Sequence, residues 1–171
     1  MTTHLQIAHA IANRFSQLPQ VEAVAVAGSI GSGYATTASD VDIYVYPTQN
    51  IPSEVCLSIA HEFAEDAAYN DYWGANLAWL DAESGIEVDV MFFTTSWMED
   101  QVRGCVERHQ AKTGYSTCFW HTIKVSQVLF DRSGWFARIQ SLANLPYPPE
   151  LARAIVRLNY PLLRDIRFSY R

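Results

Sequence analysis

The feature that most constrains the fold is a Gly-Ser pair followed, after ten further residues, by two aspartates with one residue between them. The pair, Gly28 and Ser29, starts a glycine-rich turn directly after residues 21–27, a β-branched and alanine run typical of a buried strand. Asp40 and Asp42 accompany a segment in which apolar and polar residues alternate, the period of a strand with two different faces. The pattern therefore predicts two strands joined by the turn, with both aspartates on the polar face of the second.

A third aspartate lies on another predicted strand. Residues 76–80 and 86–93 flank a short turn and predict a β-hairpin, and Asp89 lies opposite the apolar face of its second arm. Residues two apart on a strand point the same way, with Cα atoms roughly 6.6 Å apart. Asp40 and Asp42 can therefore share one site, and Asp89 from a neighbouring strand is the candidate to complete it.

Carboxylates grouped in this way suit a pair of hard divalent cations, and two such ions about 3.5 to 4 Å apart suit in-line displacement at phosphorus. Gly28 permits close approach of the backbone to a phosphate, and Ser29 adds a hydroxyl beside the N–H groups of the turn. Asp89 is the expected third metal ligand. Glu87, which shares its face, is the alternative ligand or the general base.

The rest of the chain has mainly helical spacing. Residues 128–130 predict a short last strand. Ser96 and Glu99 have the spacing of a capping box, and Pro161 should kink or end the last helix. Helices are predicted over residues 1–17, 52–64, 96–109, 117–124 and 135–142, and from Pro149 onward.

Together these elements predict an α+β fold, in which a small mixed β-sheet is backed by helices and followed by a short helical C-terminal extension. Prolines at 146, 148 and 149 form a stiff break. We expect one domain over residues 1–145 and the start of a helical extension or domain over 146–171. A truncated chain, a missing helical domain and a homodimer contact are all open explanations for the apolar stripe of the last helix.

The composition of the chain argues against several kinds of binding partner. The chain has 171 residues, 49% of them hydrophobic, which is enough for one compact domain. Its net charge of -6 argues against bulk nucleic-acid binding, which uses basic surfaces. The N-terminus lacks a secretory pattern, and no apolar run approaches the roughly 20 residues of a membrane span. Three scattered cysteines are expected to be reduced, and we expect a cytoplasmic location without membrane contact.

The order of Gly28-Ser29, ten residues, Asp40-x-Asp42 and a strand-borne Asp89 resembles the polymerase-beta-type nucleotidyltransferase superfamily over residues 21–93. The resemblance implies the nucleotidyltransferase fold. It also implies that the first two aspartates bind both metal ions, that the third binds the catalytic one, and that the Gly-Ser turn holds the triphosphate. Residues 117–134 look like small-molecule nucleotidyltransferases of the antibiotic-modifying kind.

One departure from the family concerns charge. Many relatives carry Arg or Lys in the turn where this chain has Ser32, so the phosphate charge has to be met elsewhere, with Lys124 and Arg132 as candidates. The predicted nucleotide-binding residues are Gly28, Ser29, Ser32 and Lys124.

The expected function is transfer of a nucleoside monophosphate from a nucleoside triphosphate, ATP in the first instance, to a hydroxyl of a small-molecule acceptor, with Mg²⁺ or Mn²⁺ and release of pyrophosphate. One alternative is modification of a partner protein, because minimal nucleotidyltransferase antitoxins share the Gly-Ser and Asp-x-Asp spacing. Another is a non-catalytic nucleotide-binding module.

Other motifs favour ordinary roles. The glycines of the turn have the wrong order for a dinucleotide-binding loop, and no P-loop lysine follows. The five histidines lack metal-ligand spacing, so surface or packing roles are expected, least firmly for His121. Four aromatic residues could stack on a base or a flat acceptor, although core packing is favoured, namely Tyr69, Tyr72, Trp73 and Trp79.

Overall fold

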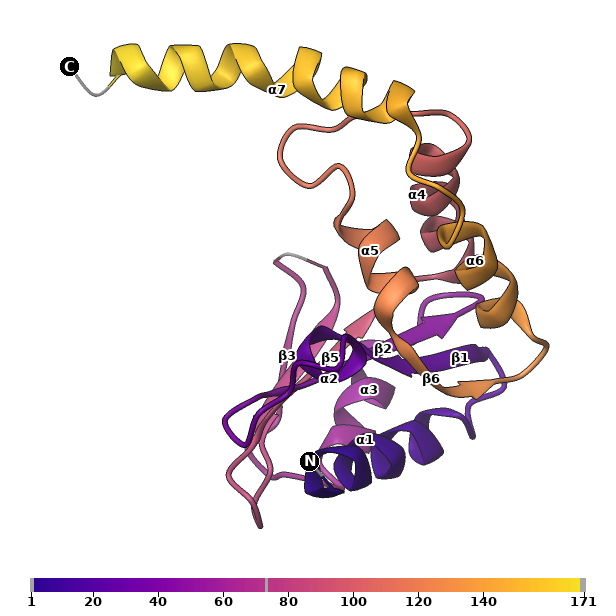
Figure 1. Ribbon diagram of the computed structural model, residues 1–171. Helices are drawn as coiled ribbons and strands as arrows, with labels where there is room; N and C mark the ends of the chain where they lie inside the picture. The colour runs from indigo at the N-terminus through magenta and orange to yellow at the C-terminus, as the bar shows by residue number, and fades with distance from the viewer. Residues whose placement is uncertain (1, 73, 170–171) are drawn as a thin grey trace.

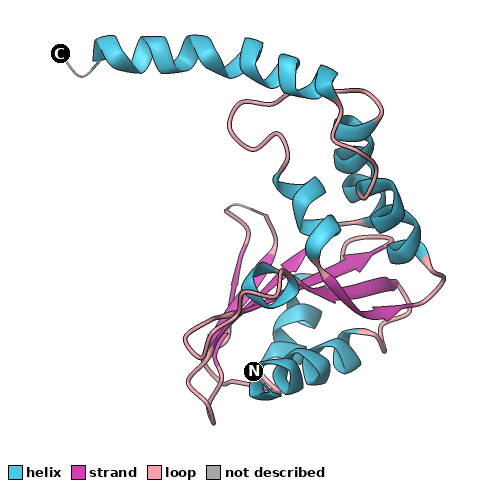
Figure 2. Ribbon diagram, in the orientation of Figure 1, coloured by secondary structure: helices cyan, strands magenta, loops and turns pink. Residues whose placement is uncertain are grey.

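A six-stranded sheet with helices on both faces forms the body of the molecule (Figures 1 and 2). The computed structural model describes residues 2–72 and 74–169, without the side chains of residue 2 and of residues 163–169. In chain order the elements are α1 (Thr2–Phe15), β1 (Val21–Val26), α2 (Gly28–Gly31), β2 (Val41–Pro47), α3 (Ser53–Ala60), β3 (Ala68–Asn70), β4 (Asn76–Leu80), β5 (Glu87–Phe92), α4 (Thr95–Val106), α5 (Cys118–Val125), β6 (Gln127–Asp131), α6 (Trp135–Ala143) and α7 (Pro149–Ser169).

The sheet is mixed, with the strand order β3-β4-β5-β2-β1-β6. Strands β2 and β5 run parallel in its centre, whereas every other pair of neighbours is antiparallel. The parallel register sets Asp42 directly opposite Asp89. Because side chains at paired positions project to the same face, this register alone brings the two carboxylates together. The predicted α+β class, with a mixed sheet backed by helices, is confirmed.

The alternation of β2 divides its side chains between two hydrophobic layers. Val41, Ile43 and Val45 are fully buried against α1 and α3. Tyr44 and Tyr46 face the opposite layer, which α4, α5 and α6 cover over the β1 half of the sheet (Figure 1). The aspartates belong to this second face, so the strand has the apolar and polar sides that its sequence predicts.

Four local details differ from the sequence predictions. The strand β3 was not expected, and the start of the glycine turn is a single helical turn, α2. The cap of α4 is Thr94, whose hydroxyl accepts a hydrogen bond from the Trp97 N–H, so the predicted capping box at Ser96 is wrong. Glu99 instead accepts a hydrogen bond of 2.7 Å from the Trp135 indole of α6.

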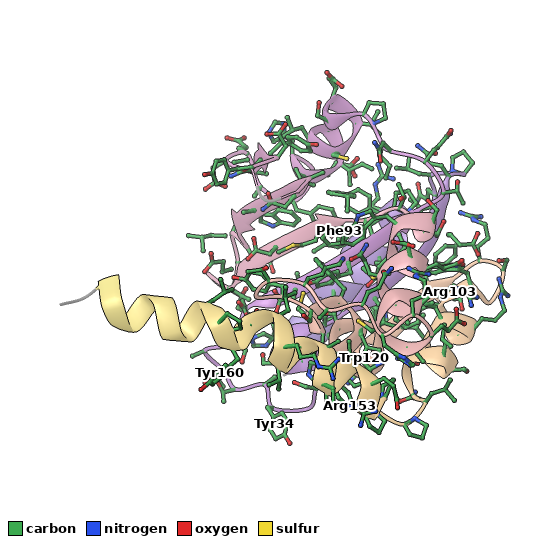
Figure 3. All side chains as sticks on the ribbon, turned by 90° about the horizontal axis from the view of Figure 1, so that it is seen from above. Tyr34, Phe93, Arg103, Trp120, Arg153 and Tyr160 are labelled. Atoms are coloured by element: carbon green, nitrogen blue, oxygen red, sulfur yellow. The ribbon has the colours of Figure 1, made fainter. Side chains whose placement is uncertain are left out.

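The fourth difference is that the last helix continues through Pro161, which excludes one of the two effects predicted for that proline, an end of the helix. Seen from above, α7 extends well beyond the rest of the molecule (Figure 3). Its exposed apolar residues include Val156 and Tyr160.

The division of the chain at residue 145 stays a prediction. None of the helices within the described ranges is both long and apolar enough to cross a membrane.

Candidate active site

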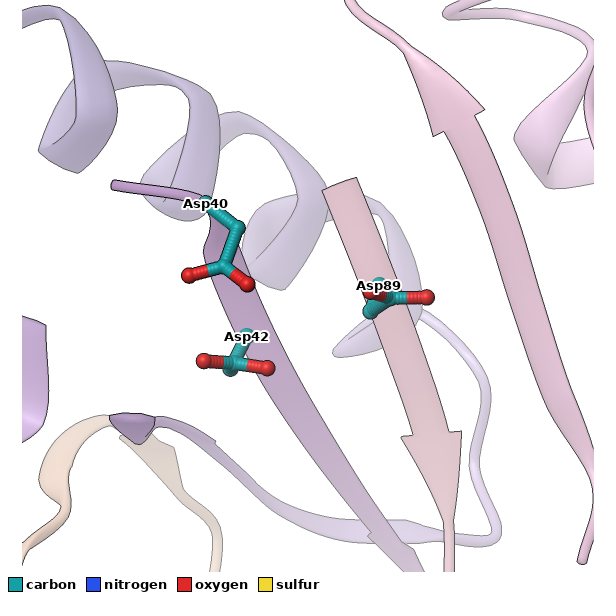
Figure 4. Close-up of side chains that lie close together, drawn as sticks. All are labelled: Asp40, Asp42 and Asp89. Atoms are coloured by element: carbon teal, nitrogen blue, oxygen red, sulfur yellow. The ribbon is translucent and has the colours of Figure 1, made fainter. Parts of the chain in front are cut away.

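Three carboxylates meet at the centre of the sheet. Asp40 immediately precedes β2, Asp42 lies within it, and Asp89 lies on the parallel neighbour β5 (Figure 4). One carboxylate oxygen from each residue lies within 4.8 Å of the other two. The structure thus gathers the three residues that the sequence singled out as metal ligands.

The grouping is electrostatically costly for the metal-free protein. The pKa of Asp42 rises to about 6 because of burial, reinforced by the negative charges of Asp40 and Asp89. The pKa of Asp89 is also raised, first by burial and then by Glu87 and Asp40. A divalent cation would reverse this balance, since it favours the charged form of each carboxylate.

The donor set fits hard divalent ions. All three side chains offer carboxylate oxygens, the ligands that Mg²⁺ and Mn²⁺ prefer, and within this cluster there is no sulfur or imidazole ligand of the kind that suits softer metals. Asp40 is exposed and the other two aspartates are half-buried, which leaves room for water or phosphate oxygens as further ligands. Metal binding by these residues remains a prediction that the geometry favours.

The Gly-Ser turn lies directly against Asp42. A Cβ atom at Gly28 would lie 1.8 Å from Oδ2 of Asp42, and the residue has a left-handed φ of 54°. Glycine is therefore required on both counts. The neighbouring Ser29 hydroxyl is buried and finds no hydrogen-bond partner in the described part of the chain. Such a group is costly to leave unsatisfied, and a phosphate oxygen is one acceptor that would suit it.

Ser32 is bound within its own turn. Its hydroxyl donates to the Gly28 carbonyl at 2.8 Å and lies 3.3 Å from the Ser29 carbonyl. Its predicted role in nucleotide binding is untested. In this arrangement its oxygen is turned toward carbonyls, whereas phosphate binding needs a free donor.

A polar cavity of about 330 Å³ lies between the turn and α5. Gly31 makes the approach of α5 possible, because a Cβ there would lie 2.8 Å from the Val26 carbonyl oxygen and 3.2 Å from that of Val125. We call this space the α5 cavity. Its lining consists of Gly28, Ser32, Asp42, Tyr44, His121, Thr122 and Val125.

Tyr44, His121 and Thr122 were not among the predicted site residues. The position of Tyr44 two residues after Asp42 is a signal that could have found it, since both share one face of β2. Burial first, and then the charge of Asp42, raises the pKa of Tyr44 to about 12, so its phenol stays protonated at neutral pH. No local spacing could have placed α5 beside the turn.

A second polar cavity, of about 390 Å³, lies on the other side of the aspartates. Residues 37–40 and the turn between β4 and β5 line it, including Asp40, Ser84 and Glu87. We call it the hairpin cavity. The α5 cavity includes Asp42 and the hairpin cavity includes Asp40, so the carboxylate cluster lies between two polar spaces.

A third cavity, of about 490 Å³, shares no residue with the carboxylate cluster. It lies at the far ends of β2 and β5, where Tyr69, Phe93 and Trp97 contribute to its lining. Of the four aromatic residues considered from the sequence, Trp79 is buried and stacks on Phe63, as expected for core packing, and Trp73 lies outside the described residues.

The two basic side chains that were predicted to meet the phosphate charge lie outside the α5 cavity. The ammonium group of Lys124 lies 5.0 Å from the centre of the Trp120 ring. The guanidinium of Arg132 donates hydrogen bonds to the carbonyls of Val21, at 2.9 Å, and of Ser16, at 2.7 Å. Neither side chain lines the cavity, and the role proposed for Lys124 is untested.

The family described as "Polymerase beta, Nucleotidyltransferase" matches residues 9–93, which include the turn and all three aspartates. Residues 9–93 form a domain of the polymerase-beta-type nucleotidyltransferase superfamily. Among curated proteins, none matches the chain.

The solved structures that are similar to the chain include the following two. One is Cid1 in complex with the UTP analog UMPNPP, with 16% identity over 59% of this chain and a TM-score of 0.40. This chain covers only 30% of that protein. The other is a toxin-antitoxin with AMP-PNP, with 12% identity, 93% of this chain and 98% of the other covered, and a TM-score of 0.46.

Proposed function

We propose that the chain transfers a nucleoside monophosphate from a nucleoside triphosphate to a hydroxyl of a small-molecule acceptor, with two Mg²⁺ ions and release of pyrophosphate. The observation that carries the proposal is the meeting of Asp40, Asp42 and Asp89 within 4.8 Å beside the Gly-Ser turn. Bound ions would activate the attacking oxygen and neutralise the leaving pyrophosphate. Membership of the superfamily supports the reaction class.

The three aspartates have distinct places in this proposal. Asp42 lies beside the turn and the α5 cavity, and Asp40 borders the hairpin cavity, so these two residues bridge the spaces for nucleotide and acceptor. Asp89 would hold the ion nearest the acceptor. Its carboxylate would also accept the proton of the attacking hydroxyl, with exposed Glu87 as the nearby alternative.

The charge distribution supports a small neutral or cationic acceptor. From residue 15 to residue 102, which includes β1 to β5, the sequence has 14 acidic residues and neither Lys nor Arg. The hairpin cavity opens on this acidic part of the chain. A polyanion such as DNA or RNA would be repelled there, whereas hydroxyl groups and amines would be accepted.

The test is a product analysis with the purified chain. Each of the four NTPs, labelled at the α-phosphate, is incubated with Mg²⁺ or Mn²⁺ and a panel of amino alcohols, polyols and sugars, and pyrophosphate release is measured. Asp40→Asn and Asp89→Asn should lower turnover at least 100-fold. Glu83→Gln, an exposed acid on the same hairpin, is the matched control and should retain activity.

Two other outcomes separate the alternatives. Label transferred to a co-purifying protein, with no small molecule modified, would indicate a protein-modifying enzyme. Nucleotide binding that needs no divalent ion, survives Asp42→Asn and leads to no pyrophosphate release would indicate a non-catalytic module and would overturn the proposed function.

A further inference from the structure

The triphosphate of a nucleotide brings several negative charges, and the turn that would receive it contains no basic residue. Among the described residues that line the α5 cavity, His121 is the one whose side chain can carry a positive charge. It lies on α5, across the cavity from Gly28 and Ser32. The imidazole is exposed, so a ligand in the cavity can reach it.

The other groups around the cavity supply little positive charge or donor capacity. Lys124 lies over the Trp120 ring, and Arg132 is bound to carbonyls near the end of α1. The Ser32 hydroxyl is committed to its own turn. Among the described residues around the cavity, the neutral side-chain donors beside His121 are the buried Ser29 hydroxyl, the phenol of Tyr44 and the hydroxyl of Thr122, which is hydrogen-bonded to that phenol.

The distribution of charge along the sequence also favours phosphate binding beside α5. From Arg103 to the end of the sequence there are 11 basic residues against four acidic ones, the reverse of the preceding segment. The helix α5 belongs to this basic segment, whereas the hairpin cavity belongs to the acidic one. A highly negative phosphate chain is therefore favoured on the α5 side of the carboxylate cluster.

We propose that the imidazole of His121 donates a hydrogen bond to an oxygen of the β- or γ-phosphate of the bound nucleoside triphosphate, an inference that rests on the proposed function. In-line displacement needs the leaving pyrophosphate and the attacking oxygen on opposite sides of the α-phosphorus. With the pyrophosphate held in the α5 cavity by His121, the acceptor hydroxyl approaches from the hairpin cavity past Asp40.

The test measures binding separately from turnover. The affinities of the unsubstituted chain for a non-hydrolysable nucleoside triphosphate and for the matching nucleoside monophosphate are determined with Ca²⁺ or Mn²⁺ by calorimetry. His121→Ala should weaken triphosphate binding about tenfold, the loss expected for one hydrogen bond to a charged group, and leave monophosphate binding within about twofold. His121→Lys should restore most of the loss, because a lysine supplies both charge and donor.

The matched control is His61→Ala, a change at an exposed histidine at the end of α3 on the opposite face of the sheet. It should leave both affinities unchanged, and thermal unfolding confirms that each variant folds. Equal triphosphate affinity in His121→Ala and the unsubstituted chain, or an equal loss of both nucleotides, would overturn this assignment and leave the proposed function standing. If the unsubstituted chain binds no nucleotide, the proposed function fails and this assignment fails with it.

Discussion

At Gly28 the missing side chain makes room for a carboxylate as well as for a phosphate. The sequence suggested only the room for a phosphate, because the contact with Asp42 joins Gly28 to a residue 14 positions later on β2. Short motifs reveal which residue types a site needs, and here they predicted the three aspartates that the structure brings together. They do not reveal which atoms of the motif touch each other, since that depends on tertiary packing.

Gly28→Ala should lower nucleotidyl transfer at least 100-fold, because the new Cβ would lie 1.8 Å from Oδ2 of Asp42 and displace that carboxylate. Gly33→Ala is the matched control. Gly33 also has a positive φ, of 79°, but a Cβ there meets nothing within 4 Å. Both substitutions should cost about 1 kcal/mol through backbone strain, so the difference in their activities isolates the collision. Equal activity of the two variants would contradict the role assigned to Gly28.

Asp42→Asn should stabilise the metal-free protein at pH 8, although it removes one of the three predicted metal ligands. The folded-state pKa of Asp42, about 6, lies above its ordinary value of 3.8, so the folded state holds this proton more tightly. The resulting stability is fully present below about pH 4 and is lost as pH rises past 6. Because asparagine cannot ionise, the Asp42→Asn variant does not undergo this loss of stability as pH rises.

Because Asp42 is only half-buried, solvent screening reduces the expected gain to about 1 kcal/mol, or about 3 °C in Tm for a chain of this size. Differential scanning calorimetry in the presence of a chelator measures it. Glu83→Gln removes an exposed acid outside the cluster and should leave Tm unchanged. A lower Tm for Asp42→Asn at pH 8 would show that the grouped carboxylates carry no electrostatic cost.

At the scale of elements, periodicity predicted the strands that build the site. The alternation in β2 and the hairpin of β4 and β5 are strong signals, because each has one buried face. The three-residue β3 has no such signal, since none of its residues is buried. The parallel pairing of β2 with β5 joins segments more than 40 residues apart, and no local pattern could specify that register.

The start of α4 shows how a local motif can mislead. Ser96 and Glu99 have the spacing of a capping box, yet α4 begins one residue before Ser96 and is capped by Thr94. We predict that Thr94→Ala lowers the free energy of unfolding by about 1 kcal/mol, while Ser96→Ala changes it by less than about 0.5 kcal/mol. Urea denaturation of the two variants measures the difference. A larger loss in Ser96→Ala would restore the sequence-based assignment.

At the scale of the whole molecule, charge is divided between an acidic sheet region and a basic C-terminal segment. The carboxylate cluster belongs to the acidic region, and α5 brings the basic segment to its border. Neither the net charge of -6 nor any single motif conveys this division, which emerges when the sequence is placed on the fold. The division favours cations at the cluster and phosphates toward α5.

Divalent ions should stabilise the whole molecule in a pH-dependent way. At pH 8 Asp42 is ionised, because its pKa is about 6, and 10 mM Mg²⁺ bound with a Kd of about 1 mM would add roughly 1.4 kcal/mol, or about 4 °C in Tm. At pH 5.5, below the pKa of about 6 for Asp42, protons compete for the same oxygens and the rise in Tm should fall by at least half. Asp89→Asn should abolish the rise at both pH values, while Na⁺ at matched ionic strength should produce none. An equal Mg²⁺-induced rise in the unsubstituted chain at pH 5.5 and pH 8, or one that survives Asp89→Asn, would place the ion elsewhere on the acidic surface.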